Sequence, residues 1–145
     1  MTEIDRMLAA NEAWLGEFPG DLPVAPARKV AVVACMDSRM PLFGMLGLAV
    51  GDAHVIRNAG GVITEDVIRS LTISQHALGT REIVLVHHTE CGLQATDDIS
   101  FADVEEDVRE SVRTLQACPY LLSSDVRGTV YDVDTGVLRE VAVGD

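Results

Sequence analysis

The sequence predicts an α/β fold: a mostly parallel four-stranded sheet with an antiparallel edge strand and helices on both faces. Two features of the sequence predict it. Continuous apolar runs, typical of strands buried on both faces, occur at residues 30–34 and 83–86, and segments with helical spacing separate them. The chain then closes on a strand, turn and strand pattern over residues 128–143, which indicates an antiparallel pair.

The first 28 residues are expected to form a helical arm on a single domain that spans residues 1–145. Apolar residues recur among charged ones over 2–16, a spacing that predicts an amphipathic helix ending at Gly16. Glycines and prolines then predict an irregular, extended segment up to Pro26. Such an arm lies either on a partner subunit or across its own domain, and the sequence leaves both open.

The remaining elements alternate between strand and helix. Thr64 can cap a helix whose first turn carries Glu65 and Asp66, and Gly79 ends that helix. In chain order the pattern predicts strand 30–34, helix 40–47, strand 53–56, helix 64–78, strand 83–86, helix 101–116, strand 128–133 and strand 137–143.

Composition bounds the class of protein. With 145 residues, of which 48% are hydrophobic and 23% charged, the chain can bury one core. Its 11 basic and 23 acidic residues give a net charge of −12, so its surface repels nucleic-acid phosphates and anionic lipids. We therefore expect no nucleic-acid partner and no membrane partner. No apolar run reaches the ~20 residues that span a bilayer, and the first residues do not resemble a secretory signal, so a cytoplasmic location is expected.

The three cysteines do not form a disulfide framework, because their number is odd and a reducing compartment disfavours disulfides. Each cysteine is then buried, reactive or a metal ligand, and its neighbours decide which. Cys118 stands directly before Pro119, away from the other two, and is expected to be structural.

Polar clusters follow three of the predicted strands, at residues 35–39, 57–61 and 87–91. The carboxyl ends of parallel strands meet at one edge of a sheet, and ligand sites lie beyond that edge. We therefore expect the three clusters to form one site.

Cysteine and histidine residues in these clusters indicate a metal centre. His88 and Cys91 stand three residues apart at a strand exit, and Cys35 can reach them if the first and third strands are neighbours. Two cysteines and one histidine are a known ligand set for catalytic zinc, which keeps a fourth position open. The alternative is that they are buried side chains without a ligand. Adjacent strand residues face opposite ways, and the spacing does not decide whether His87 or His88 turns inward.

Asp37 and Arg39 follow Cys35 at two-residue spacing. A guanidinium beside a carboxylate orients it and keeps it ionised. Next to a metal, such a carboxylate can accept a hydrogen bond from metal-bound hydroxide, or bind the metal itself as a conditional fourth ligand. A surface ion pair without a catalytic role is the alternative.

These motifs resemble those of the β-class carbonic anhydrases, and most closely their compact prokaryotic branch. The similarity covers residues 2–96 and resumes in the helix at 101–116 and in the closing hairpin. It is carried by Cys-Met-Asp-Ser-Arg at 35–39, Val-Ile-Arg-Asn-Ala-Gly-Gly at 55–61, Val-Ile-Arg-Ser-Leu at 67–71 and His-Thr-Glu-Cys-Gly at 88–92.

The resemblance implies a role for each site residue. Cys35, His88 and Cys91 would bind Zn²⁺, so His88 would be the ligand rather than His87. Asp37 and Arg39 would form the catalytic dyad. The family also implies a homodimer or homotetramer in which the N-terminal arms are exchanged.

The implied function is a zinc lyase that hydrates CO₂ to bicarbonate through attack of zinc-bound hydroxide. Hydrolysis of COS or CS₂ on the same scaffold is the alternative. A zinc-binding protein without catalytic activity is a third possibility, against which the intact Asp37 and Arg39 argue.

Two departures from the family pattern stand out. Residues 92–100 are shorter than the usual segment, which we take for a natural deletion that leaves a wall of the site incomplete. Glu90 stands where the branch more often has aspartate, a change that we expect to be minor.

Overall fold

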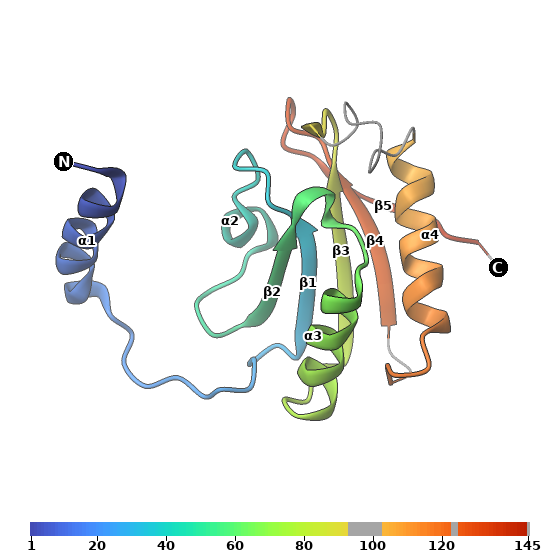
Figure 1. Ribbon diagram of the computed structural model, residues 1–145, viewed down its shortest axis with the longest axis horizontal. Helices are drawn as coiled ribbons and strands as arrows, with labels where there is room; N and C mark the ends of the chain where they lie inside the picture. Colours follow the sequence, from blue (N-terminus) through green and yellow to red (C-terminus); the bar gives the residue numbers. More distant parts are fainter. Residues whose placement is uncertain (93–102, 123–124, 145) are drawn as a thin grey trace.

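The computed structural model describes residues 1–92, 103–122 and 125–144, and within them a five-stranded sheet has the order β2-β1-β3-β4-β5 (Figure 1). Strand β5 (Leu138–Val141) runs antiparallel at the β4 edge. The other four strands are parallel: β1 (Val30–Cys35), β2 (Ala53–Asn58), β3 (Glu82–His88) and β4 (Asp125–Tyr131). The predicted fold class is thus confirmed.

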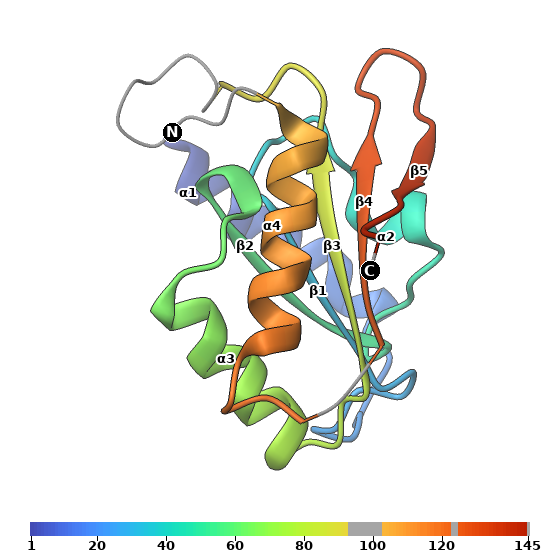
Figure 2. The ribbon, with the colours of Figure 1, turned by 90° about the vertical axis from the view of Figure 1, so that its right-hand side faces the viewer.

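Helices cover both faces of the sheet, as Figure 2 shows: α3 (Glu65–His76) and α4 (Val104–Ala117) lie side by side on one face, and the short α2 (Leu42–Leu46) lies on the other. The alternation of side chains along β1 divides the core accordingly. Ala31 and Val33 pack with buried residues of α3 and α4, whereas Val32 and Ala34 pack in a second cluster with Leu42 of α2.

Helix α3 begins where the sequence predicts, whereas α2 begins at Leu42 instead of residue 40. Helix α4 begins at Val104, and its predicted start at residue 101 lies outside the described residues. Thr64 caps α3 by accepting a hydrogen bond from the backbone of Val67, and Asp103 caps α4 in the same manner toward Glu105. Helix α3 ends at His76, earlier than predicted, and Gly79 adopts the left-handed conformation that turns the chain toward β3.

Strand β4 also begins earlier than predicted, at Asp125 instead of Gly128. Asp125 and Arg127 are charged and exposed, so their side chains carry no strand signal, yet their backbone pairs in register with β3. Gly128 lets α4 approach this strand closely, because a Cβ there would overlap Cγ1 of Val108.

The N-terminal segment lies apart from the sheet (Figure 1). Helix α1 (Glu3–Trp14) starts with a capping box between Thr2 and Asp5 and continues into a 3-10 turn over Leu15–Glu17. No residue of α1 is buried. Its apolar side chains therefore remain exposed in the described part of the chain. In the described part of the chain, no helix combines the length and the apolar character needed to cross a membrane.

Candidate metal centre

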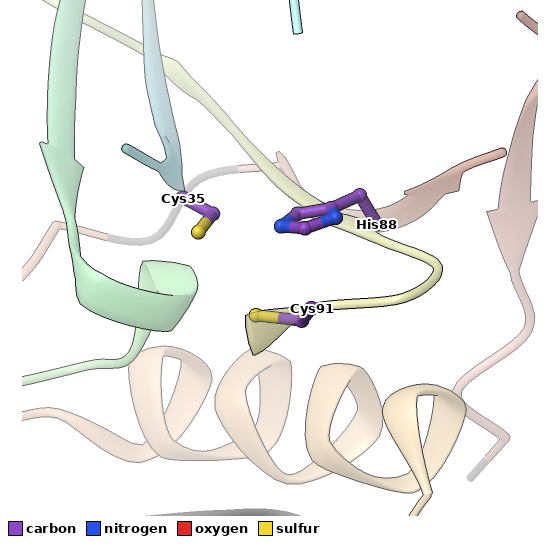
Figure 3. Close-up of side chains that lie close together, drawn as sticks. All are labelled: Cys35, His88 and Cys91. Carbon is purple, nitrogen blue, oxygen red and sulfur yellow. The ribbon is translucent and has the colours of Figure 1, made fainter. Parts of the chain in front are cut away.

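The parallel register of β1 and β3 brings their carboxyl ends together, and both strands end in a metal-ligating residue type. Cys35 is the last residue of β1 and His88 the last of β3. Together with Cys91 they form a buried group whose ligand atoms all lie within 4.8 Å of one another, with the side chains turned toward a common point (Figure 3). The structure therefore brings together the three residues that the sequence singled out as ligands.

The turn after β3 returns the chain so that Cys91 faces the same point. Glu90 has a φ of 52°, in the left-handed region that residues other than glycine rarely adopt. Two hydrogen bonds fix the turn to the end of β4: the backbone N–H of Thr89 donates to the carbonyl of Tyr131 at 2.9 Å, and the N–H of Val133 donates to Thr89 Oγ1 at 3.1 Å.

The hydrogen bond of His88 defines its tautomer. Its Nδ1 lies 2.7 Å from the carbonyl oxygen of Thr89, and because a carbonyl only accepts, Nδ1 carries the proton. Nε2 then has a free lone pair, and it is buried without a hydrogen-bond partner. The side chain of His87 leaves the strand on the opposite face, where its Nε2 lies 3.2 Å from the carbonyl of Gly61. It is therefore His88 that reaches the two thiols.

The donor set fits a metal of the zinc type. A buried imidazole lone pair without a partner is costly unless a ligand satisfies it, and the two cysteine sulfurs beside it are soft donors. Two thiolates and one neutral imidazole leave a fourth tetrahedral position open.

Asp37 is held beside this group by Arg39. The guanidinium donates from Nε to Oδ1 at 3.0 Å and from Nη2 to Oδ2 at 2.7 Å, and the backbone N–H of Arg39 donates to Oδ1 at 2.8 Å. These hydrogen bonds, the side-chain ones first, hold the pKa of Asp37 well below its usual range, although burial of the carboxyl opposes them. Asp37 Oδ2 also lies 3.7 Å from Nε2 of His88. An ionised carboxylate thus faces the open side of the donor group.

Arg57 contacts the segment that carries Asp37 and Arg39. The sequence placed Arg57 in the second polar cluster but did not indicate this contact. Its Nε donates to the carbonyl of Cys35 at 2.9 Å and its Nη2 to the carbonyl of Asp37 at 2.7 Å. Nη2 of Arg39 similarly donates to the carbonyl of Glu90 at 2.9 Å, which links the dyad to the turn that carries Cys91.

A cavity of about 280 Å³ opens onto the thiols and the carboxylate. Its lining residues are Cys35, Met36, Asp37, Ala59, Gly60, Cys91 and Gly92. A larger apolar groove of about 770 Å³ lies between α3 and α4, away from this site, and the half-buried Cys118 lines it, so that cysteine lies apart from the other two. The predicted effect of the short 92–100 segment concerns residues that, after Gly92, lie outside the described part of the chain.

The fold and the donor group define a class of protein: an α/β domain with a candidate cysteine–histidine metal centre at the carboxyl edge of a parallel sheet. The family model for carbonic anhydrase matches residues 30–118, which include all three ligand candidates and the dyad. β-carbonic anhydrase 1 of Mycobacterium tuberculosis is 47% identical, with 97% of this chain and 99% of the relative covered. The chain belongs to the β-class carbonic anhydrases, an enzyme family.

Two further similar proteins have different activities in their names, one a carbonic anhydrase and the other a carbon disulfide hydrolase. The crystal structure of a carbonic anhydrase from Streptococcus mutans superposes with a TM-score of 0.93 at 43% identity, with 98% of this chain and 99% of that chain covered. A carbon disulfide hydrolase from Acidithiobacillus thiooxidans is 37% identical, with 79% of this chain and 62% of the relative covered.

Proposed function

We propose that the protein is a zinc-dependent carbonic anhydrase that interconverts carbon dioxide and bicarbonate. The single observation that carries this proposal is the unpartnered Nε2 of His88, which lies between two buried thiols and an ionised carboxylate. Cys35, His88 and Cys91 would hold the zinc ion, and the bound ion would supply the Lewis acidity that makes water a nucleophile near neutral pH.

Asp37 would act as the acceptor that orients the nucleophile. Because Arg39 keeps it ionised and binds both of its oxygens, the carboxylate can accept a hydrogen bond but is not free to move onto the metal. Loss of the Arg39 contacts would release Asp37 to become the conditional fourth ligand. We therefore assign the catalytic function to Asp37 and the orienting function to Arg39.

The cavity suits a small uncharged substrate. Met36, Ala59 and Gly60 give part of its lining no charge, whereas Asp37 contributes a carboxylate to it. Carbon dioxide needs little desolvation to enter such a space, and its electrophilic carbon would lie beside the acceptor.

Hydrolysis of CS₂ or COS is the second candidate, because a carbon disulfide hydrolase is 37% identical over 79% of this chain. The same ligands and dyad would serve that reaction, and the shape of the entrance would select the substrate.

A stopped-flow assay of CO₂ hydration on protein of known metal content, with COS assayed in parallel, tests the proposal. We expect hydration that rises between about pH 7 and 9 and that requires one zinc per chain. Zinc-loaded protein that ignores CO₂ and consumes COS would establish the second candidate. Protein that converts neither would contradict both.

We also infer that the chain functions as a homodimer or homotetramer. Ile4, Met7 and Leu8 of α1 are each more than 60% exposed, and burial of such residues by a second subunit is favourable. The arm would supply that contact, as the family resemblance implies. A cytoplasmic location remains a prediction from the sequence.

A further inference from the structure

His87 is a buried histidine that the proposed chemistry does not use. It is 1% exposed, and its Nε2 lies 3.2 Å from the carbonyl oxygen of Gly61 and 3.4 Å from Oδ2 of Asp107 on α4. Because a carbonyl only accepts, Nε2 carries the proton and donates it toward Gly61. The Asp107 carboxylate beside the same nitrogen favours that tautomer and that ring orientation electrostatically.

The Gly61 end of this contact is tightly packed. Gly61 has a φ of +65°, and a Cβ there would lie 3.0 Å from the backbone of Ala34 and of Cys35 and 3.2 Å from Cδ2 of His87. The turn at 59–61 therefore lies between the end of β1 and the imidazole ring. The position of the ring limits where this turn can lie.

The same turn supplies a hydrogen bond to one of the proposed ligands. The backbone N–H of Gly60 donates to Sγ of Cys35 at 3.3 Å. An N–H that points at a thiolate stabilises its negative charge and lowers the electron density that the sulfur gives to a metal. A small displacement of the turn would lengthen this bond.

The Asp107 end of the contact is fixed by the packing of α4. Gly128 lets α4 lie close against β4, with Val108 at the point of closest approach, and Asp107 is the preceding residue on that helix. Asp107 thus reaches His87 from a helix whose distance to the sheet is set by close packing.

We propose that His87, oriented by Asp107, is a positioning residue of the metal centre: it holds the 59–61 turn against β1 and so fixes the Gly60 N–H on the Cys35 thiolate. The proposal rests on the proposed metal site. It goes beyond that site because it names a second layer of residues, on the opposite face of β3, that controls the donor strength of one ligand.

A role in stability alone would make a different prediction. A buried histidine that merely fills the core would lower the melting temperature when replaced, but the spectrum of a bound metal would stay the same. Replacement of a positioning residue also changes the metal–thiolate bond. Mutation of such hydrogen-bonding partners typically weakens metal affinity by about 10- to 100-fold. Cobalt in place of zinc reports that bond directly through the thiolate-to-cobalt charge-transfer band.

The experiment compares the full-length parent with His87→Leu and Asp107→Asn. His87→Gln is the rescue variant, because its amide N–H can take the place of the Nε2–H. Glu110→Gln, on the exposed side of α4, is the control for loss of one negative charge on that helix. Each protein is measured for its cobalt spectrum, its zinc affinity by chelator competition at fixed pH, and its melting temperature.

We expect His87→Leu and Asp107→Asn to move the charge-transfer band to longer wavelength and to weaken zinc binding by about tenfold or more. His87→Gln should lie close to the parent, and Glu110→Gln should match it. Variants that bind cobalt and zinc like the parent, with only a lower melting temperature, would overturn the positioning role and leave the metal site intact. A parent that binds neither metal would overturn the metal site, and this proposal with it.

A second variant tests the same contact from the other side and covers the case in which His87→Leu does not fold. Gly61→Ala should displace the turn from Cys35 and shift the cobalt band in the same direction. Gly44→Ala, where a Cβ would meet nothing within 4 Å, is its control. An unshifted band in folded Gly61→Ala would also count against the proposal.

Discussion

Arg39 binds both carboxylate oxygens of Asp37, at 3.0 Å and 2.7 Å, while the second of these oxygens lies 3.7 Å from Nε2 of His88. The carboxylate therefore faces the donor group but is held by the guanidinium. This arrangement separates two functions that a carboxylate beside a metal can have: accepting a hydrogen bond, and binding the metal itself.

Replacement of the carboxylate should separate catalysis from metal binding. We expect Asp37→Asn to retain zinc and to lose at least about 100-fold in CO₂ turnover, because the ligands remain but the ionised acceptor is gone. Metal analysis and stopped-flow hydration measure the two quantities. Asp134→Asn, which removes an exposed carboxylate from the hairpin turn after β4, should keep both zinc and turnover. If Asp37→Asn turned over CO₂ like the parent, the pair of Asp37 and Arg39 would have a structural function only.

The three proposed ligands should each be required for zinc. Cys35→Ser, His88→Ala and Cys91→Ser each remove one protein ligand of three, so the purified variants should contain little zinc. Cys118→Ser is the matched control, because Cys118 lies in the groove between α3 and α4, and it should bind zinc like the parent. Normal zinc content in the Cys91 variant would show that Cys91 is not a zinc ligand.

The pair of Asp37 and Arg39 should make stability depend on pH in a defined direction. The folded-state pKa of Asp37 is lowered, first by the side-chain hydrogen bonds from Arg39, so it lies below the unfolded value of about 3.9. The pair therefore stabilises the fold fully above that value, and the stabilisation is lost as the pH falls toward the folded-state pKa.

Arg39→Gln measures this contribution. In metal-free protein, we expect the variant to be slightly less stable than the parent at pH 7, since the guanidinium is partly exposed to solvent and the pair is screened. The difference in unfolding free energy should shrink at pH 3. Denaturant unfolding at both pH values checks it, and in the Asp37→Asn background the pH dependence of the difference should disappear. A difference that grows on acidification would contradict this assignment.

The arm should control assembly. Leu8 is 64% exposed on α1, and its replacement by glutamate places a charge on the apolar side of the helix. We expect Leu8→Glu to lower the molar mass measured by light scattering at micromolar concentration, because a buried charge without a partner disfavours the subunit contact. Ala13, on the opposite side of the same helix, provides the control variant Ala13→Glu, which should assemble like the parent. A parent that is monomeric and fully active would contradict the oligomer.

The sequence by itself determined the sheet and the location of the candidate site. Buried parallel strands need continuous apolar runs, and the residues that follow them must meet at one edge, so the sequence alone predicts that Cys35 and Cys91 share one site with Asp37 and Arg39. The start of β4 was not predicted, because the backbone pairing of Asp125 and Arg127 does not depend on their polar side chains.

Only the tertiary structure decided how the site is held together. Local spacing could not choose between His87 and His88, because that choice depends on which face of β3 is turned toward the thiols, and the structure turns His88 there. The contacts of Arg57 with the backbone of Cys35 and of Asp107 with His87 join segments that lie 20 or more residues apart in the sequence. Such contacts depend on the distance between strands and helices. Packing sets that distance, and no local pattern of residues predicts it.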